Sequence, residues 1–138
     1  MHIGEPAWNG HLTADLHSAI AILHSFGARV VLFTMPYLHP SDRQPDGRPW
    51  PENTPARVQD YNALVRQVAH ADPGVVSVID LNRMLAPGGV YTASLSGIDV
   101  RSNDGIHVSP EGGELLQRQI LPVVDRIGME DEAGRARE

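Results

Sequence analysis

The sequence predicts an α/β domain with parallel strands, and three observations support this. Two runs rich in Val, Ile and Leu, residues 28–34 and 75–80, are typical of strands buried on both faces of a parallel sheet. A segment with apolar residues at helical spacing precedes each run, namely residues 7–26 and the segment that begins at Thr54. A last helical segment, residues 110–127, follows an irregular stretch. This alternation implies right-handed crossovers, with helices on the faces of the sheet.

Capping residues mark the ends of the predicted helices. Gly27 is suited to closing the first helix, because glycine readily adopts the left-handed conformation that ends many helices. Thr54-Pro55 opens the second helix as N-cap and first helical residue, and Ser109-Pro110 opens the last one in the same way. Pro122 lies inside the last helix, so we expect it to kink that helix or cut it short.

Two strands make a poor sheet, because each leaves one edge unpaired while both faces need cover. We therefore expect residues 1–128 to be part of a larger α/β domain. Residues 129–138 are rich in charged residues, Ala and Gly, and are predicted to be a disordered tail. The exposed strand edges also allow self-association, since an unpaired edge can accept a strand from another chain.

The connection after the first strand, about residues 36–53, is long and rich in proline. Long loops of this kind are usually functional lids or disordered segments. Pro36, Tyr37 and Trp50 are candidate substrate-binding residues, because apolar and aromatic side chains line most small-molecule pockets. The alternative, which the sequence leaves open, is that Tyr37 and Trp50 anchor the loop to the surface.

Composition excludes several classes of function. The 138 residues carry a net charge of −6 with scattered Lys and Arg, which argues against a nucleic-acid partner or an anionic membrane surface. The chain has no cysteine, which excludes disulfides, a thiol nucleophile and a thiolate metal site. His11, His17 and His24 do not have the spacing of a helical metal pair, so we expect neither a metal nor a cofactor. No apolar run is long enough to span a bilayer, and the N-terminus as written has no signal peptide.

The strongest chemical signal is Asp104-Gly105-Ile106-His107, directly before the capped last helix. A carboxylate beside an imidazole is a general base with its orienting partner, and such a pair needs only a nucleophile. Asp104 and His107 are therefore the candidate catalytic residues. The structural alternative is that Asp104 caps a turn and His107 packs at the helix start. Asp80, at the end of the second strand, is predicted to cap a short helical turn rather than to act in catalysis.

The segments around these residues resemble a known family. Asp104-Gly105-Ile106-His107, followed by Ser109-Pro110-Glu111-Gly112, resembles the last conserved block of SGNH (GDSL-type) hydrolases. Residues 27–36 resemble the penultimate strand of that family with its following proline. The segments 61–64 and 78–81 also resemble its C-terminal half. More narrowly, the chain is similar to SGNH domains fused to membrane acyltransferases that O-acylate cell-surface glycans.

This resemblance implies a flavodoxin-like α/β/α fold and a Ser-His-Asp triad in which Asp104 and His107 are the acid and the base. It also implies a substrate that carries ester or acyl groups on carbohydrate, and a site of action outside the cytoplasmic membrane for the full-length relatives. The resemblance covers nearly the whole chain but only the second half of the family domain. It therefore implies that residues 1–128 are the C-terminal part of a three-layer α/β/α domain whose N-terminal half is absent.

The nucleophile of the triad is missing from the sequence. The chain has no Gly-Asp-Ser block, no Gly-x-Asn-Asp block and no Gly-x-Ser-x-Gly elbow. Ser94, Ser96 and Ser102 lie in a polar loop near the pair, but no motif singles one of them out. We therefore expect a truncated SGNH-type esterase or O-acyltransferase domain that is inactive alone. The alternatives are a non-catalytic carbohydrate-binding module and a structural module that completes its sheet with another chain.

Overall fold

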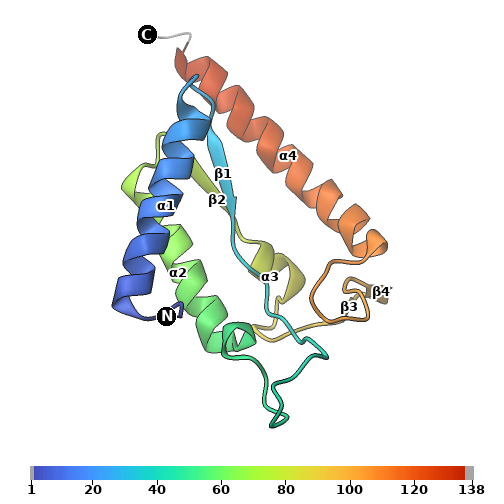
Figure 1. Ribbon diagram of the computed structural model, residues 1–138. Helices are drawn as coiled ribbons and strands as arrows, with labels where there is room; N and C mark the ends of the chain where they lie inside the picture. Colours follow the sequence, from blue (N-terminus) through green and yellow to red (C-terminus); the bar gives the residue numbers. More distant parts are fainter. Residues whose placement is uncertain (1, 136–138) are drawn as a thin grey trace.

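The computed structural model describes residues 2–135 and has the α/β architecture that the sequence predicts. The elements in chain order are α1 (Pro6–His24), β1 (Val30–Phe33), the 3₁₀ helix η1 (Pro51–Asn53), α2 (Pro55–Ala71), β2 (Val76–Ile79), α3 (Leu81–Leu85), β3 (Ser94–Leu95), β4 (Ile98–Asp99) and α4 (Pro110–Arg135). The strands β1 and β2 are parallel, with Val30 paired to Val76 and Phe33 to Ile79. Figure 1 shows α1 and α2 on one side of this sheet and α4 on the other. The prediction of an α/β fold with parallel strands is confirmed.

The main apolar core lies between the sheet and the helices α1 and α2. Its buried residues come from all four elements and are Ile20, Val30, Leu64, Val68, Ala69 and Val76. A second cluster joins α3 to α4 through Leu85, Val100 and Leu116. Because burial of such side chains stabilises each by about 1.5–3 kcal/mol, the first cluster holds the sheet against α1 and α2, and the second holds the start of α4 against α3.

Polar side chains hold the chain where it leaves β1. The Asn62 amide of α2 accepts a hydrogen bond from the Met35 backbone N–H at 2.6 Å and donates to the Met35 carbonyl at 2.8 Å. The Asn82 side chain accepts from the Tyr37 N–H at 3.0 Å. Asp80 accepts from the Arg83 N–H at 3.1 Å and from the Thr34 hydroxyl at 2.8 Å, so its predicted capping role is confirmed. The start of the long loop is thereby fixed to α2, α3 and the end of β2.

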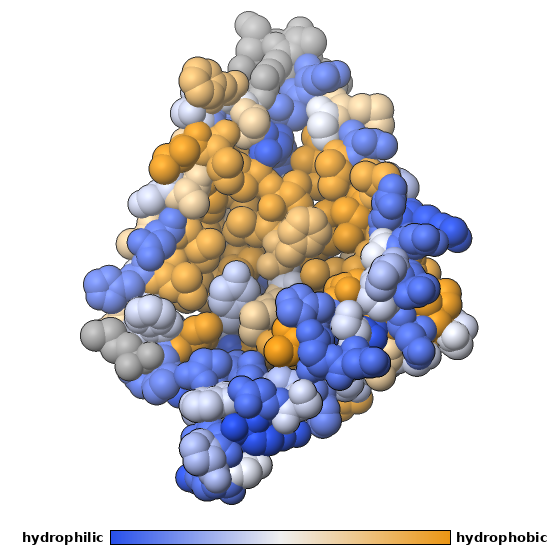
Figure 2. Space-filling model, turned by 45° about the vertical axis from the view of Figure 1, so that its right-hand side comes forward, coloured by the Kyte–Doolittle hydropathy of each residue, from blue (hydrophilic) through white to orange (hydrophobic). Residues whose placement is uncertain are grey.

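The sheet is less buried than the sequence suggests. Of the four residues of β1 only Val30 is buried, and Phe33 is 41% exposed. Both strands have one unpaired edge among the described residues, so part of each strand lacks cover. Figure 2 shows a continuous apolar expanse across the middle of one face of the molecule. Exposed apolar side chains come from α1, from β1 and from α4, and include Leu23, Phe33, Leu121 and Val124.

The irregular stretch predicted for residues 87–101 contains a short hairpin. β3 and β4 pair antiparallel, with Ser94 opposite Asp99 and Leu95 opposite Ile98. The two loop residues, Ser96 and Gly97, have φ angles of 51° and 79°. Positive φ at both central positions is the mark of a tight hairpin turn that suits the twist of its strands. Strands of two residues are too short for any alternation of apolar and polar residues to reveal them.

The last helix is longer than expected. α4 continues through Pro122 to Arg135, so it neither ends near Ile127 nor gives way to an irregular tail at Met129. Pro122 removes only one N–H from the helix, and both Leu121 and Pro122 are exposed, so water can bond the carbonyl that loses its partner. Residues 136–138 of the predicted tail lie outside the described residues.

Candidate active site

Asp104 and His107 form a hydrogen-bonded pair on the loop that enters α4. The Asp104 Oδ2 and the His107 Nδ1 are 2.5 Å apart. The other carboxylate oxygen, Oδ1, accepts the backbone N–H groups of Ile106 at 2.8 Å and of His107 at 3.0 Å. One carboxylate therefore shapes the turn and orients the imidazole at the same time. A catalytic role for the pair and a turn-capping role for Asp104 are compatible in this geometry, whereas His107 is exposed and does not pack at the helix start.

The pair leaves one imidazole nitrogen available for chemistry. The hydrogen bond from His107, followed by those from the two N–H groups, lowers the pKa of Asp104 from 3.8 to about 2. An ionised carboxylate only accepts hydrogen bonds, so at neutral pH the Nδ1 of His107 carries the proton. In the neutral ring Nε2 is then the basic nitrogen, and within residues 2–135 it has no hydrogen-bond partner. The His107 side chain is 75% exposed, so Nε2 is accessible.

Gly105 allows the loop to make its turn. Its φ is +71°, a backbone conformation that side chains other than that of glycine rarely adopt. A Cβ atom at this position would lie 1.9 Å from the His39 carbonyl oxygen. The His39 N–H donates to the Gly105 carbonyl at 2.9 Å. The pair is thus attached directly to the loop that follows β1, and a side chain at residue 105 would push these segments apart.

Arg101 is the supporting residue that the sequence reasoning missed. Its guanidinium donates to the Ile106 carbonyl at 3.0 Å and to the Tyr37 carbonyl at 2.8 Å, and the residue is only 6% exposed. It lies 5.6 Å from the centre of the Tyr91 ring, a distance that allows a cation–π interaction. Burial lowers the pKa of Arg101 from its usual value, opposed by Tyr91 and Asp104. The sequence shows only that an arginine directly precedes the loop, and no motif predicts that its guanidinium bonds the carbonyl oxygens of Tyr37 and Ile106.

The N-terminus of α4 fixes the C-terminal end of the Asp104–His107 loop. Ser109 is the N-cap, as predicted, because its hydroxyl accepts the Gly112 N–H at 2.9 Å and donates to the Asp99 carbonyl at 2.5 Å. A Cβ atom on Gly112 would lie 2.6 Å from the Val100 carbonyl oxygen. The helix therefore starts close against Val100, which directly follows β4.

The three candidate substrate-binding residues do not come together at one cavity. Tyr37 is buried, and its hydroxyl accepts a hydrogen bond from Gln59 at 3.1 Å. The Trp50 indole is 40% exposed and donates to Asp42 at 3.1 Å. Tyr37 lines a cavity of about 290 Å³ to which neither Pro36 nor Trp50 contributes. Substrate binding by these residues stays a prediction.

No described serine is in the position of a nucleophile. Ser94 and Ser96 are exposed in the β3–β4 hairpin, and the Ser102 hydroxyl lies 3.5 Å from the Val108 carbonyl oxygen. None of the serine hydroxyls within residues 2–135 is hydrogen-bonded to His107. Within the same residues there is no cluster of side chains suited to holding a metal ion. The part of the chain that the structure describes also contains no helix long and apolar enough to cross a membrane.

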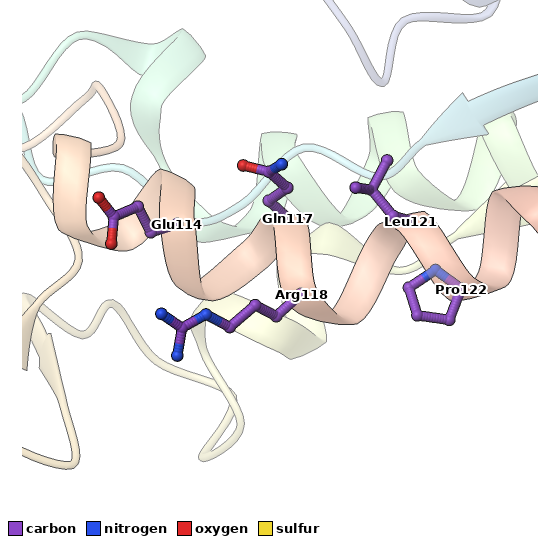
Figure 3. Close-up of a pocket in the computed structure, with 5 residues that line it drawn as sticks. All are labelled: Glu114, Gln117, Arg118, Leu121 and Pro122. Carbon is purple, nitrogen blue, oxygen red and sulfur yellow. The ribbon is translucent and has the colours of Figure 1, made fainter.

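A surface depression of about 560 Å³ is bordered by residues of α4 alone. Figure 3 shows that their side chains point away from one another: Gln117 and Leu121 project to one side of the helix, and Arg118 and Pro122 to the other. A site that recognises a small molecule needs polar groups that converge on it. The loop with Asp104 and His107 is therefore the better candidate for chemistry.

A family model described as a protein of unknown function, DUF459, matches residues 1–123, which is most of the chain. The chain belongs to the DUF459 family. No curated protein matches the sequence. In this DUF459 chain the Asp104–His107 loop lies within the matched residues, and so does the start of α4 that follows it.

The hydrogen bonds to Asp104 predict a specific loss of stability in acid. In the folded DUF459 chain the pKa of this carboxyl is about 2, against 3.8 without its partners. Below about pH 4 the unfolded chain binds a proton that the folded chain excludes, so stability falls with pH until the folded carboxyl is protonated near pH 2. We expect Asp104→Asn to remove this part of the pH dependence, measured by urea unfolding at a series of pH values between 5 and 2.

The control is Asp125→Asn, which changes an exposed carboxylate of α4 that has no side-chain partner among the described residues. This variant is expected to keep the wild-type pH profile. Identical profiles for Asp104→Asn and the wild type would contradict the assigned bonds.

Proposed function

We propose that the chain supplies the acid and the base of an SGNH (GDSL-type) serine esterase or O-acyltransferase that acts on acyl groups of carbohydrate. The observation that carries this proposal is the Asp104–His107 pair, with Nδ1 bonded to an ionised carboxylate and Nε2 free and exposed. The resemblance of residues 104–112 to the last SGNH block supports it, as does the α/β arrangement around the loop. The carbohydrate part of the proposal rests on the resemblance alone.

In the proposed reaction His107 acts twice. Its Nε2 first accepts the proton of a serine hydroxyl while the serine oxygen attacks the ester carbonyl. The resulting imidazolium then gives that proton to the leaving alcohol. Asp104 keeps the proton on Nδ1 and stabilises the positive charge of the ring. Water completes the cycle of an esterase by attacking the acyl-enzyme, and a sugar hydroxyl does so in a transferase.

The unpaired edge of β1 leaves room for a further parallel strand, and the proposed serine would follow the end of that strand. The carboxyl ends of parallel strands meet at one edge of a sheet, and active sites of α/β proteins lie there. The loop after β1 reaches Gly105 through the His39 N–H, so the Asp104–His107 pair lies close to that edge. A further parallel strand beside β1 would end at the same edge, and the apolar expanse in Figure 2 would be covered by the elements that accompany it.

Removal of the base tests the proposal. The protein to assay is the product that includes a Gly-Asp-Ser segment encoded in frame upstream of Met1, with p-nitrophenyl acetate and an O-acetylated oligosaccharide as substrates. We expect His107→Ala to lower kcat by at least about 10³-fold, since loss of a triad member typically has an effect of this size or larger. His70→Ala, which removes another exposed histidine from α2, is the matched control.

Two results would refute the proposal. One is that the His107→Ala and His70→Ala variants both retain the esterase activity of the wild type. The other is DNA upstream of Met1 that encodes no Gly-Asp-Ser segment in frame, because the triad could not then be completed within one chain.

A further inference from the structure

A cavity separate from the Asp104–His107 pair lies beneath the loop that follows β1. Its volume is about 290 Å³, and it is lined by residues 37–40, Arg43, Pro49, residues 53–55 and residues 89–91. Neither Asp104 nor His107 lines it. A second cavity, of about 360 Å³, reaches Ser102, Asn103 and Gly105 and shares only His39 and Tyr91 with the first.

The walls of this cavity are apolar and stiff. Three of the lining residues are prolines, Pro40, Pro49 and Pro55, whose rings fix the backbone angle φ. The Tyr91 ring packs against His39 with their centres 5.3 Å apart. A cavity of this kind is largely formed before a ligand arrives, so little binding energy is lost to ordering of the protein.

The polar groups on the walls favour an anion. Arg43 lines the cavity, and within residues 2–135 its guanidinium has no hydrogen bond or ion pair. No Asp or Glu lines the cavity, although the chain as a whole carries a net charge of −6. The side-chain amide of Asn53 and the ring nitrogens of His39 also have no partner among the described residues. The cavity therefore combines an apolar body with one cation and unused hydrogen-bonding groups.

We propose that this cavity binds a small carboxylate with an apolar body, of the size of one aromatic ring or a short acyl chain. The carboxylate bonds Arg43, and the apolar body contacts the prolines and Tyr91. A volume of about 290 Å³ lies just below the range for ligand pockets, about 300–1,000 Å³, which excludes a nucleotide or an oligosaccharide. This inference is independent of the proposed esterase function, because the cavity does not include the catalytic pair.

A titration of the full chain with benzoate, followed by amide chemical shifts in NMR, tests the proposal. We expect shifts confined to residues 37–55 and 89–91, with a dissociation constant of about 1 mM as is usual for so small a ligand. Arg43→Gln is expected to weaken binding about tenfold, since a hydrogen bond to a charged group contributes about that factor. Arg126→Gln makes the same change of charge on α4 and is expected to bind benzoate like the wild type. Benzyl alcohol, of similar size but neutral, is expected to bind more weakly than benzoate.

A second pair of variants keeps the test independent of Arg43. Val90 lines the cavity and is 66% exposed, so polar replacements do not disturb the core. Val90→Asp places a carboxylate on the wall and is expected to weaken benzoate binding, whereas Val90→Asn, of nearly the same size, retains most of it. Shifts that spread over the surface, equal effects of Arg43→Gln and Arg126→Gln, or equal binding of benzoate and benzyl alcohol would each overturn the proposal.

Discussion

Asp104→Asn is expected to move the proton of His107 from Nδ1 to Nε2. In the wild type Nδ1 donates to an ionised carboxylate oxygen 2.5 Å away. An asparagine can keep its Oδ1 as acceptor for the N–H groups of Ile106 and His107, which places its NH₂ group next to Nδ1. Two donors cannot face each other, so the ring adopts the tautomer in which Nδ1 accepts. The nitrogen chemical shifts of the imidazole distinguish the two tautomers in the chain as it stands.

The tautomer decides whether His107 can act as a base. With the proton on Nε2, the exposed nitrogen donates a hydrogen bond and cannot accept the proton of a serine. In the product that includes the Gly-Asp-Ser segment we therefore expect Asp104→Asn to lower kcat by about 10⁴-fold. This is the size of effect found when the orienting aspartate of a triad is replaced by asparagine. Because the turn keeps both of its N–H bonds, the fold around residue 107 should not change at neutral pH.

Asp125→Asn is again the control, and it is expected to leave both the ring nitrogen shifts and kcat at their wild-type values. A variant Asp104→Asn in which Nδ1 remains protonated would show that Asp104 does not set the tautomer. Full activity in that variant would exclude the role assigned to the pair.

The features that could be read from the sequence are those that depend on residues close together in the chain. The Asp104–His107 pair, the Ser109 cap and the Asp80 cap each involve groups within about three residues of one another along the backbone. Apolar spacing likewise predicted α1 and α2, and continuous apolar runs predicted both parallel strands, because all four elements contribute residues to the same core.

The features that were missed depend on contacts between distant segments or on exposure. The bond from Arg101 to the Tyr37 carbonyl joins residues 64 positions apart, and no local pattern encodes it. Phe33 lies on the face of β1 opposite to that of Val30 and Leu32, and the described residues leave that face partly exposed, whereas the sequence of β1 alone is typical of a buried strand. Pro122 is tolerated because its side of α4 faces solvent, which composition does not reveal.

Arg101→Met is expected to loosen the Asp104–His107 loop and to lower the stability of the fold. The replacement keeps an apolar stem of similar length beside Tyr91 but removes the donors to the carbonyl oxygens of Tyr37 and Ile106. Hydrogen bonds from a charged group contribute about 1.5–3 kcal/mol each, and part of that loss is offset because the charge no longer has to be buried. We expect the free energy of unfolding to fall by about 2 kcal/mol in urea titrations.

Hydrogen exchange separates a local effect of this variant from a global one. The His39 N–H bonds the Gly105 carbonyl, and the Ser102 N–H bonds the His107 carbonyl, so these two amides report on the loop. In Arg101→Met they should lose more protection than the amides of α1 and α2. Arg126→Met, an exposed arginine of α4, is the matched control and is expected to change neither stability nor exchange.

The effect on catalysis follows from position, because Arg101 touches the loop rather than the basic nitrogen of His107. In the product that includes the Gly-Asp-Ser segment, Arg101→Met should lower kcat while KM for p-nitrophenyl acetate stays near its wild-type value. The reason is that the imidazole of His107 spends less time in the orientation needed for proton transfer. Arg101→Lys, which retains a cation able to reach one of the two carbonyls, should recover part of both stability and kcat. If Arg101→Met and Arg126→Met had equal stability and equal loop exchange, Arg101 would not be what holds the Asp104–His107 loop against the end of β1.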